Sequence, residues 1–390
     1  MLEFLARLLA FQWRRDGAAL REVDLSGCRV WYAEFAPRPE RPAPGARRGR
    51  PARIRPASAG RRRPSPTLVL LHGLGATAAS FFPVIPALRH TYRVIVPDLP
   101  GNGWSRPPEG RAWLTFPELL EVTERLVDRV APEGAFLAGN SMGGWLAAKL
   151  AARRPDLVRG LALLNPGGPA LHAEDWADFG QALTADHRAA VAELVARLFH
   201  RPPLATRLLG RDIRRLLRAP SVLQLVSSLQ AEDFVTAEEA AGLACPSVLI
   251  WGENDRLIPE GCRDFFLEQL PRVRYEPVPD CGHCPQLECP RRTAEILLQL
   301  PRMRRRAGGG VAAAGGAVGG GSGADGADGA AGATAATAAG SASVRVRGAG
   351  GDAPAAGAGA ATGRSDADGG RGARAGVVTS GAAASASRRH

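Results

Sequence analysis

The chain has 390 residues and a formal net charge of +12, with 50 basic and 38 acidic side chains. Most of the positive charge lies in two segments: 37–66 holds ten arginines and one glutamate, and 302–390 holds eleven arginines and five aspartates. The other residues carry 29 basic and 32 acidic side chains, and this slightly acidic balance argues against a nucleic-acid-binding domain.

Both charged segments are of low complexity. Residues 37–66 are almost entirely Pro, Arg, Ala, Gly and Ser, and residues 302–390 are mostly Ala and Gly. They hold too few large apolar side chains to offset the conformational entropy lost on folding, so we predict a disordered linker and a disordered tail. We expect 1–36 to form a helix and a β-hairpin, and 67–301 to form the rest of the same domain. For partners we expect no specific nucleic acid, and only weak contact of the linker with anionic surfaces.

The first dozen residues predict an amphipathic helix, because Leu2, Leu5 and Leu9 recur on one helical face. Such a helix can lie on a membrane interface or dock on the folded domain, and we favour docking. The segment has neither the basic start nor the small-residue cleavage site of a signal peptide, and no apolar run is long enough to span a bilayer. We therefore expect a cytoplasmic protein whose contact with membranes, if any, is peripheral.

Strand and helix signals alternate along the rest of the chain. Apolar and β-branched runs predict strands, and runs with a 3.6-residue apolar period predict helices. The expected strands are 22–25, 29–35, 67–71, 92–97, 135–139, 160–164, 247–251 and 274–278, and the expected helices are 116–130, 142–153, 260–270 and 292–300. This alternation indicates an α/β fold with a mostly parallel, doubly wound sheet that helices cover on both faces.

The stretch from about 168 to 242 breaks the alternation. Its pattern is helical without a clear strand, and it stands between two sheet strands, as an inserted helical cap would. The cap is rich in Leu, which suits an apolar pocket. Its arginines either rim that pocket or face solvent: Arg201, Arg207, Arg211, Arg214, Arg215 and Arg218.

A G-x-S-x-G sequence stands between a predicted strand and a predicted helix, with Ser141 between Gly139 and Gly143. This arrangement is typical of a nucleophile elbow, in which a sharp turn pushes the serine out of the sheet edge. The glycines are needed because a Cβ would collide with the neighbouring helix and strand. The serine also lies at a helix N-terminus, where unpaired N–H groups favour negative charge.

The loop L-L-H-G-L-G follows an earlier strand and is lined by Gly73 and Gly75. In such a loop the N–H of Leu74 can join that of Met142 as an oxyanion hole. We predict that His72, in the same loop, makes structural hydrogen bonds and does not carry a proton.

An acid and a base follow later strands. W-G-E-N-D places Asp255 just beyond the next-to-last predicted strand, and D-C-G-H-C places His283 beyond the last one. Enzymes with a nucleophile elbow carry these residues in the same order along the chain: Ser, then the acid, then His. Asp280 and Glu253 are second choices for the acid, and Asn165 is excluded because it carries no charge.

With four motifs in this order, residues 22–300 resemble the α/β-hydrolase superfamily. The resemblance implies acyl transfer, in which His283 removes the proton of Ser141 as it attacks a carbonyl and Asp255 orients the imidazole. A water then frees the acid from the acyl-enzyme. The resemblance further implies a lipase-like carboxylic ester hydrolase that acts on a small apolar acyl substrate without a cofactor or a metal.

Other activities stay open on the same triad. G-N-S-M-G-G also resembles carbon–carbon bond hydrolases, although those usually carry an aromatic residue after the catalytic His, where this chain has Cys284. A thioesterase or an acyltransferase would use the same residues. Ser141 argues against the dehalogenase and epoxide hydrolase subfamilies, which use Asp there. An alternative of another class is a non-catalytic ligand-binding protein on this fold.

The six cysteines are too few and too scattered for a disulfide scaffold. Cys281 and Cys284 match a C-x-x-C redox motif, and together with His283 and Cys289 they could form a zinc site. The late position in the chain argues against the redox interpretation, and the irregular spacing argues against zinc.

Overall fold

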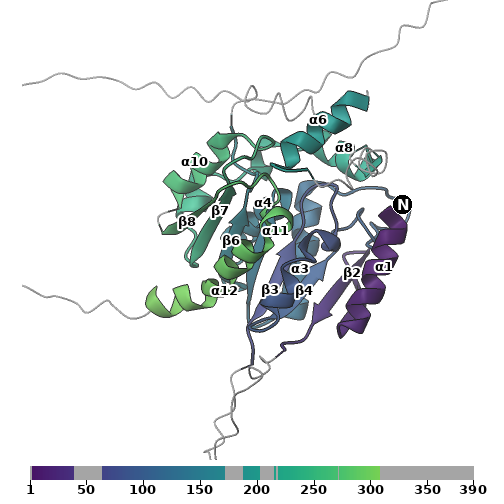
Figure 1. The fold of residues 1–390 in the computed structure, drawn as a ribbon, viewed down its shortest axis with the longest axis horizontal. Coiled ribbons are helices and arrows are strands. Elements are labelled where there is room, and N and C mark those ends of the chain that lie inside the picture. Colours follow the sequence, from purple (N-terminus) through teal and green to yellow (C-terminus); the bar gives the residue numbers. More distant parts are fainter. Residues whose placement is uncertain are drawn as a thin grey trace, which may run out of the picture. The chain divides into compact units, whose positions relative to one another are not determined.

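One eight-stranded sheet organises the part of the chain that the computed structural model describes, namely residues 2–38, 64–171, 188–202, 215–216, 218–270 and 272–307 (Figure 1). The strands are β1 (Ala18–Leu25), β2 (Cys28–Phe35), β3 (Thr67–Leu71), β4 (Arg93–Pro97), β5 (Ala135–Asn140), β6 (Val158–Leu164), β7 (Ser247–Gly252) and β8 (Val273–Val278). Their order is β1-β2-β4-β3-β5-β6-β7-β8, with β1/β2 and β2/β4 antiparallel and the other pairs parallel. The predicted mostly parallel α/β sheet is confirmed.

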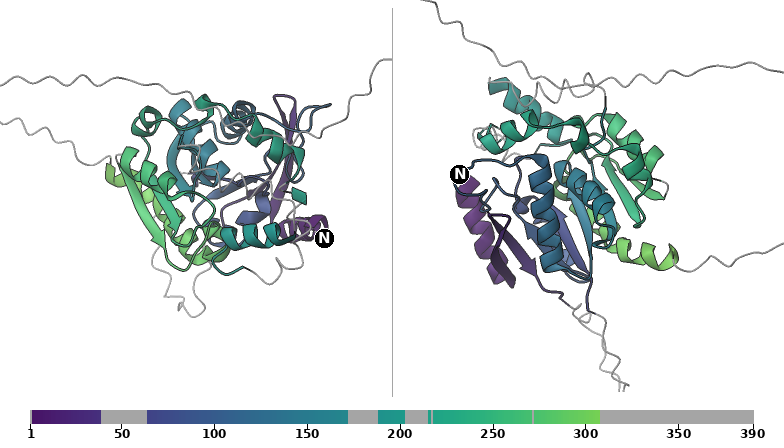
Figure 2. Two further views of the ribbon diagram at one scale, coloured as in Figure 1. Left: turned by 90° about the horizontal axis from the view of Figure 1, so that it is seen from above. Right: turned by 180° about the vertical axis from the view of Figure 1, so that it is seen from behind.

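The helices divide between the two faces of this sheet. One face takes α3 (Phe116–Val130), α4 (Met142–Arg153) and α10 (Glu260–Gln269), and the other takes α1 (Leu2–Arg15), α2 (Ile85–Leu88) and α12 (Pro290–Ala307). Successive strand residues point to opposite faces, so each apolar run fills both cores; in β3, Leu68 contributes to one core and Val69 to the other. At the edge of the sheet, α1 lies beside the β1–β2 hairpin (Figure 2). None of the described helices combines the length and the apolarity needed to cross a bilayer.

Two element boundaries differ from the prediction by more than three residues, both at the periphery of the fold. β1 begins at Ala18 and not at residue 22, because it pairs with β2 along its whole length while its half-exposed side chains give only a weak apolar signal. α12 continues to Ala307, past the predicted end of the domain at 301, and Met303 still packs against the core there. Most of the predicted linker, and the predicted tail from residue 308 onward, lie outside the described residues.

The predicted cap leaves the sheet region near Gly168 and returns at Val235. The Val235 N–H donates to the Gly168 carbonyl at 2.8 Å, which holds the two ends of this insertion side by side. Residues 172–187, 203–214 and 217 of the predicted cap lie outside the described residues. Its described elements are α6 (Arg188–Leu198), α8 (Pro220–Ser227), η2 (Ala231–Asp233) and α9 (Ala237–Ala241).

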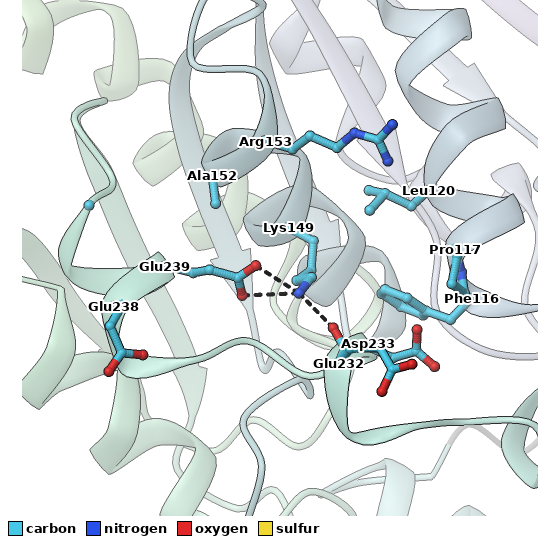
Figure 3. Close-up of a pocket in the computed structure, with 11 residues that line it drawn as sticks. Phe116, Pro117, Leu120, Lys149, Ala152, Arg153, Glu232, Asp233, Glu238 and Glu239 are labelled. Atoms are coloured by element: carbon cyan, nitrogen blue, oxygen red, sulfur yellow. Dashed lines mark hydrogen bonds and ion pairs between the residues drawn. The ribbon is translucent and has the colours of Figure 1, made fainter.

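A cavity of about 580 Å³ lies between α3, α4 and residues 232–242, the returning segment of the cap (Figure 3). Lys149 of α4, the only lysine in the chain, donates there to two main-chain carbonyls of the returning segment, at 3.0 and 3.1 Å, and to the Glu239 carboxylate. Trp145, one turn earlier, donates its indole N–H to the Asp233 carbonyl at 2.8 Å. The helix that follows the predicted nucleophile therefore also anchors the end of the cap.

We expect Lys149→Met to lower the free energy of unfolding by about 2–3 kcal/mol, because two carbonyls and a partly buried carboxylate lose their donor. Urea unfolding followed by circular dichroism measures the change. As a control, Arg125→Met removes an exposed ion pair with Glu121 on α3 and should change stability little. A Lys149→Met protein as stable as this control would contradict the anchoring role.

Candidate active site

The turn between β5 and α4 holds Ser141 in a strained backbone conformation, with φ +56° and ψ −120°. Its N–H donates to the Leu164 carbonyl at 3.0 Å. A Cβ added at Gly139 would lie 2.1 Å from the Gly143 carbonyl oxygen, and one added at Gly143 would lie 2.1 Å from the Leu71 carbonyl oxygen. Only glycine fits at either position, which agrees with the requirement for a nucleophile elbow.

Asp255 and His283 meet beyond the ends of β7 and β8. The imidazole Nδ1 lies 2.9 Å from Asp255 Oδ2, and the two side chains are almost completely buried, with 3% and 0% of the His283 and Asp255 side chains exposed. The other carboxylate oxygen accepts the N–H groups of Leu257 at 2.8 Å and Ile258 at 3.2 Å. With Nδ1–H donating to the carboxylate, Nε2 keeps the lone pair that a general base needs.

The second-choice acids lie elsewhere. Asp280 is 72% exposed in its side chain and faces His200 at 3.5 Å and Arg201 at 3.7 Å, and Glu253 is exposed to solvent. Of the three acids considered from the sequence, the structure brings Asp255 to His283.

Asn165 is a residue whose role the sequence did not indicate. Its Nδ2 donates to Asp255 Oδ2 at 2.7 Å, and its Oδ1 accepts the Gly252 N–H at 3.0 Å. The side chain is fully buried directly after β6, and its φ is +42°. It thus connects the end of β7 to Asp255 and positions that carboxylate. An Asn just after a strand is too common a pattern to have indicated this role from the sequence.

A second buried amide joins the turn that holds Ser141 to the His283 segment. Asn140, the neighbour of Ser141, donates from Nδ2 to the His283 carbonyl at 2.9 Å, and its Oδ1 accepts the Gln286 side-chain N–H at 3.0 Å. These contacts bridge more than 140 positions in the chain, so no local pattern could have revealed them. They bring the Ser141 and His283 segments together.

The loop that carries His283 is also tied to the cap. The His283 N–H donates to the Leu198 carbonyl at the end of α6 at 2.9 Å. Glu288 accepts the N–H groups of Gly282 at 2.9 Å and His200 at 2.8 Å. Cys284 packs with apolar side chains of the same cap region. The position of His283 therefore depends on α6 as well as on the sheet.

The predicted oxyanion loop lies against the nucleophile. A Cβ added at Gly73 would be 3.2 Å from Ser141 Cβ, and Gly75 adopts φ +65°, which favours glycine. Leu74 follows Gly73, and Met142 is the first residue of α4, where an N–H has no acceptor inside its own helix. Neither N–H group has an acceptor within the described part of the chain. Among the described residues, no group competes with a bound oxyanion for either N–H.

His72 is a structural residue of the same loop. Its Nδ1 lies 2.8 Å from the Gly73 carbonyl, and its Nε2 accepts the Leu99 N–H at 2.9 Å, which requires the neutral ring with the proton on Nδ1. Burial lowers the pKa of His72 from 6.5 to about 4. The ring thus links the loops after β3 and β4 without carrying charge.

The C-G-H-C segment lacks the properties of a redox site. The thiols of Cys281 and Cys284 are buried, and burial raises the pKa of both. Reactive C-x-x-C cysteines instead have a lowered pKa and some access to solvent. Among the described residues, no three His, Cys, Asp or Glu side chains gather in a way that could hold a metal ion.

We expect the wild-type protein to lose stability relative to His72→Gln as the pH falls from 6.5 to about 4. In that range the unfolded chain binds a proton at His72 that the folded protein does not, which amounts to about 3 kcal/mol at most. Asp98 acts in the opposite direction, because burial raises its pKa to about 6. The informative quantity is therefore the difference between the free energies of unfolding of the two proteins at each pH, measured by urea unfolding. Equal pH dependence in both would contradict a buried, neutral His72.

Comparison with known proteins gives relatives that are esterases and acyltransferase components. The pimeloyl-[acyl-carrier protein] methyl ester esterase of Aeromonas hydrophila is 28% identical over 247 residues, which cover 60% of this chain and 94% of the relative. The esterase of the same name from Nitrosomonas europaea is 29% identical over 58% of this chain and 91% of its own. The dihydrolipoyllysine-residue acetyltransferase component of the acetoin cleaving system of Pseudomonas putida is 29% identical over 60% of this chain and 63% of its own.

Solved structures with a similar fold include a phospholipase and a carboxylesterase. A membrane phospholipase A superposes with a TM-score of 0.61 at 25% identity, covering 78% of this chain and 94% of its own. A carboxylesterase from Bacillus subtilis, at 19% identity, shares the fold with a TM-score of 0.59 over 79% of this chain and 98% of its own. A sequence profile of the alpha/beta hydrolase family matches residues 68–296. The chain therefore belongs to the alpha/beta hydrolase family and is an enzyme of the esterase- and lipase-like kind.

Proposed function

We propose that this protein hydrolyses carboxylic esters of small apolar acyl groups, with Ser141 as nucleophile, His283 as general base and Asp255 as the acid that orients the base. His283 Nε2 takes the hydroxyl proton while Ser141 Oγ bonds to the carbonyl carbon. His283 then gives that proton to the departing alcohol, which leaves an acyl-enzyme. A water repeats both steps and releases the carboxylic acid.

The contact between His283 Nδ1 and buried Asp255 Oδ2 carries this proposal. It orients the imidazole and stabilises the cation formed when Nε2 takes up the proton. The N–H groups of Leu74 and Met142 supply donors for the oxyanion. Each such donor is worth about a hundredfold to a thousandfold in rate.

The relatives support an ester as the bond that is cleaved. Two of them are named methyl ester esterases and a structural neighbour is named a phospholipase A, whereas an acetyltransferase component also matches. Transfer of the acyl group to an acceptor other than water is therefore the alternative on the same triad. Cys284, in place of an aromatic residue, disfavours carbon–carbon bond cleavage.

The described arginines of the cap region offer little support for an acidic head group on the substrate. Of the six arginines named above from the sequence, Arg201, Arg215 and Arg218 are exposed to solvent, and the other three lie outside the described residues. We therefore base the expected acyl group on the apolar composition of the cap.

We expect Ser141→Ala to lower kcat/KM for p-nitrophenyl butyrate by about a thousandfold or more, because no acyl-enzyme can form. The absorbance of released p-nitrophenolate measures the rate. The control Ser26→Ala removes an exposed hydroxyl in the β1–β2 turn and should keep the wild-type rate. Retained activity in Ser141→Ala would refute the assignment. A folded wild-type protein that cleaves no ester would favour the ligand-binding alternative.

Asn165→Ala should lower kcat by about tenfold to a hundredfold with KM nearly unchanged, because the Asp255 carboxylate loses the donor that positions it. Without that donor the carboxylate stabilises the His283 cation more strongly. The acidic limb of the kcat/KM pH profile should therefore move to higher pH, which a purely structural defect would not cause. An unchanged kcat and an unchanged limb would show that Asn165 does not position the acid.

A further inference from the structure

Helix α1 is docked on the domain by one of its faces. Trp13 is 2% exposed, and its ring stacks on Trp31 with centroids 6.1 Å apart and meets Phe35 edge-on at 5.6 Å. Leu9, one turn earlier, packs against the same core. Docking, which we favoured from the sequence, thus accounts for this face of the helix.

The opposite face of α1 is apolar as well, and it is exposed. Leu8 is 53% exposed and Phe11 is 59% exposed, the two highest values for large hydrophobic residues in the described part of the chain. They stand three positions apart, so they are neighbours on the helix surface, and Arg15 lies one turn beyond Phe11 on the same side. This face contributes nothing to the hydrolase core. The family match begins only at residue 68.

Positive charge gathers at the end of this face. Arg14 and Arg15 are exposed in the last turn of α1. Just beyond it, the Arg89 side chain donates to the carbonyl of Asp16 at 2.6 Å and to that of Ala36, at the end of β2, at 3.4 Å. The end of α1 and the residue that follows β2 are therefore joined through one side chain.

We propose that the outward face of α1 is a docking surface for an anionic lipid membrane. An amphipathic helix lies in the plane of the interface with its apolar side chains among the upper acyl chains, and basic side chains beside it pair with lipid phosphates. Leu8 and Phe11 supply the apolar part, and Arg14 and Arg15 supply the charge. An apolar helix face and basic side chains together attach a protein stably to a membrane, whereas either feature alone binds only weakly. The proposal concerns where the enzyme works, and it does not depend on the triad.

Co-sedimentation of the full-length protein with lipid vesicles tests the proposal. The wild type should bind vesicles of phosphatidylcholine with phosphatidylglycerol and bind those of phosphatidylcholine alone much more weakly. The double variant Leu8→Glu/Phe11→Glu should lose about tenfold or more in partitioning, because both apolar side chains lose their favourable burial. As a matched control, Tyr275→Glu changes an exposed aromatic residue on β8, at the opposite edge of the sheet, and should bind as the wild type does.

The variant Arg14→Gln/Arg15→Gln should bind phosphatidylglycerol vesicles about tenfold more weakly, because two basic side chains no longer pair with lipid phosphates. All variants should hydrolyse a water-soluble ester at the wild-type rate, so a failure here is distinct from a failure of the proposed activity. The proposal would be overturned if the double variant Leu8→Glu/Phe11→Glu bound vesicles as well as the wild type does, or if the wild type bound neither kind of vesicle. It would also be overturned if the wild type formed a dimer without binding vesicles and that double variant were a monomer. In that case α1 would bind a second copy of the chain.

Discussion

Ser141 occupies a backbone conformation that side-chain-bearing residues rarely adopt, and the candidate active site depends on the contacts that hold it there. A φ of +56° at a non-glycine residue costs on the order of 1–3 kcal/mol, which the surrounding packing must offset. Gly139 and Gly143 allow β3, β5 and α4 to approach so closely that no side chain would fit between them. Because β5 is buried along its whole length, the turn cannot relax without disturbing both cores. The serine is thus presented at the end of a completely buried strand.

The partners of this serine come from the carboxyl ends of neighbouring parallel strands, where ligands bind in open α/β sheets. Buried amides connect these ends. Asn140 ties the turn to the His283 segment, and Asn165 ties the acid to the end of β7. Neutral groups can do this without adding charge beside the Asp255–His283 pair. His283 is held in addition by α6, so the cap also supports the geometry of the Asp255–His283 pair.

Much of this arrangement could be predicted from short motifs. Ser141, Asp255 and His283 each follow a strand, and the order of the strands along the chain brings their ends to one edge. The supporting amides could not be predicted, because their partners are distant in sequence and an Asn after a strand has no distinctive pattern. The start of β1 was missed for a different reason: an edge strand with half-exposed side chains lacks the apolar signal of the central strands.

The site of covalent modification by a fluorophosphonate most directly tests Ser141 as the nucleophile. Trypsin cleaves after Arg129 and after Lys149, and in the resulting peptide, 130–149, Ser141 carries the only hydroxyl group. Mass spectrometry of the digest should place one adduct on this peptide in the native protein and none after prior thermal unfolding. An adduct on a different peptide, or an unlabelled protein that still hydrolyses esters, would contradict Ser141 as the nucleophile.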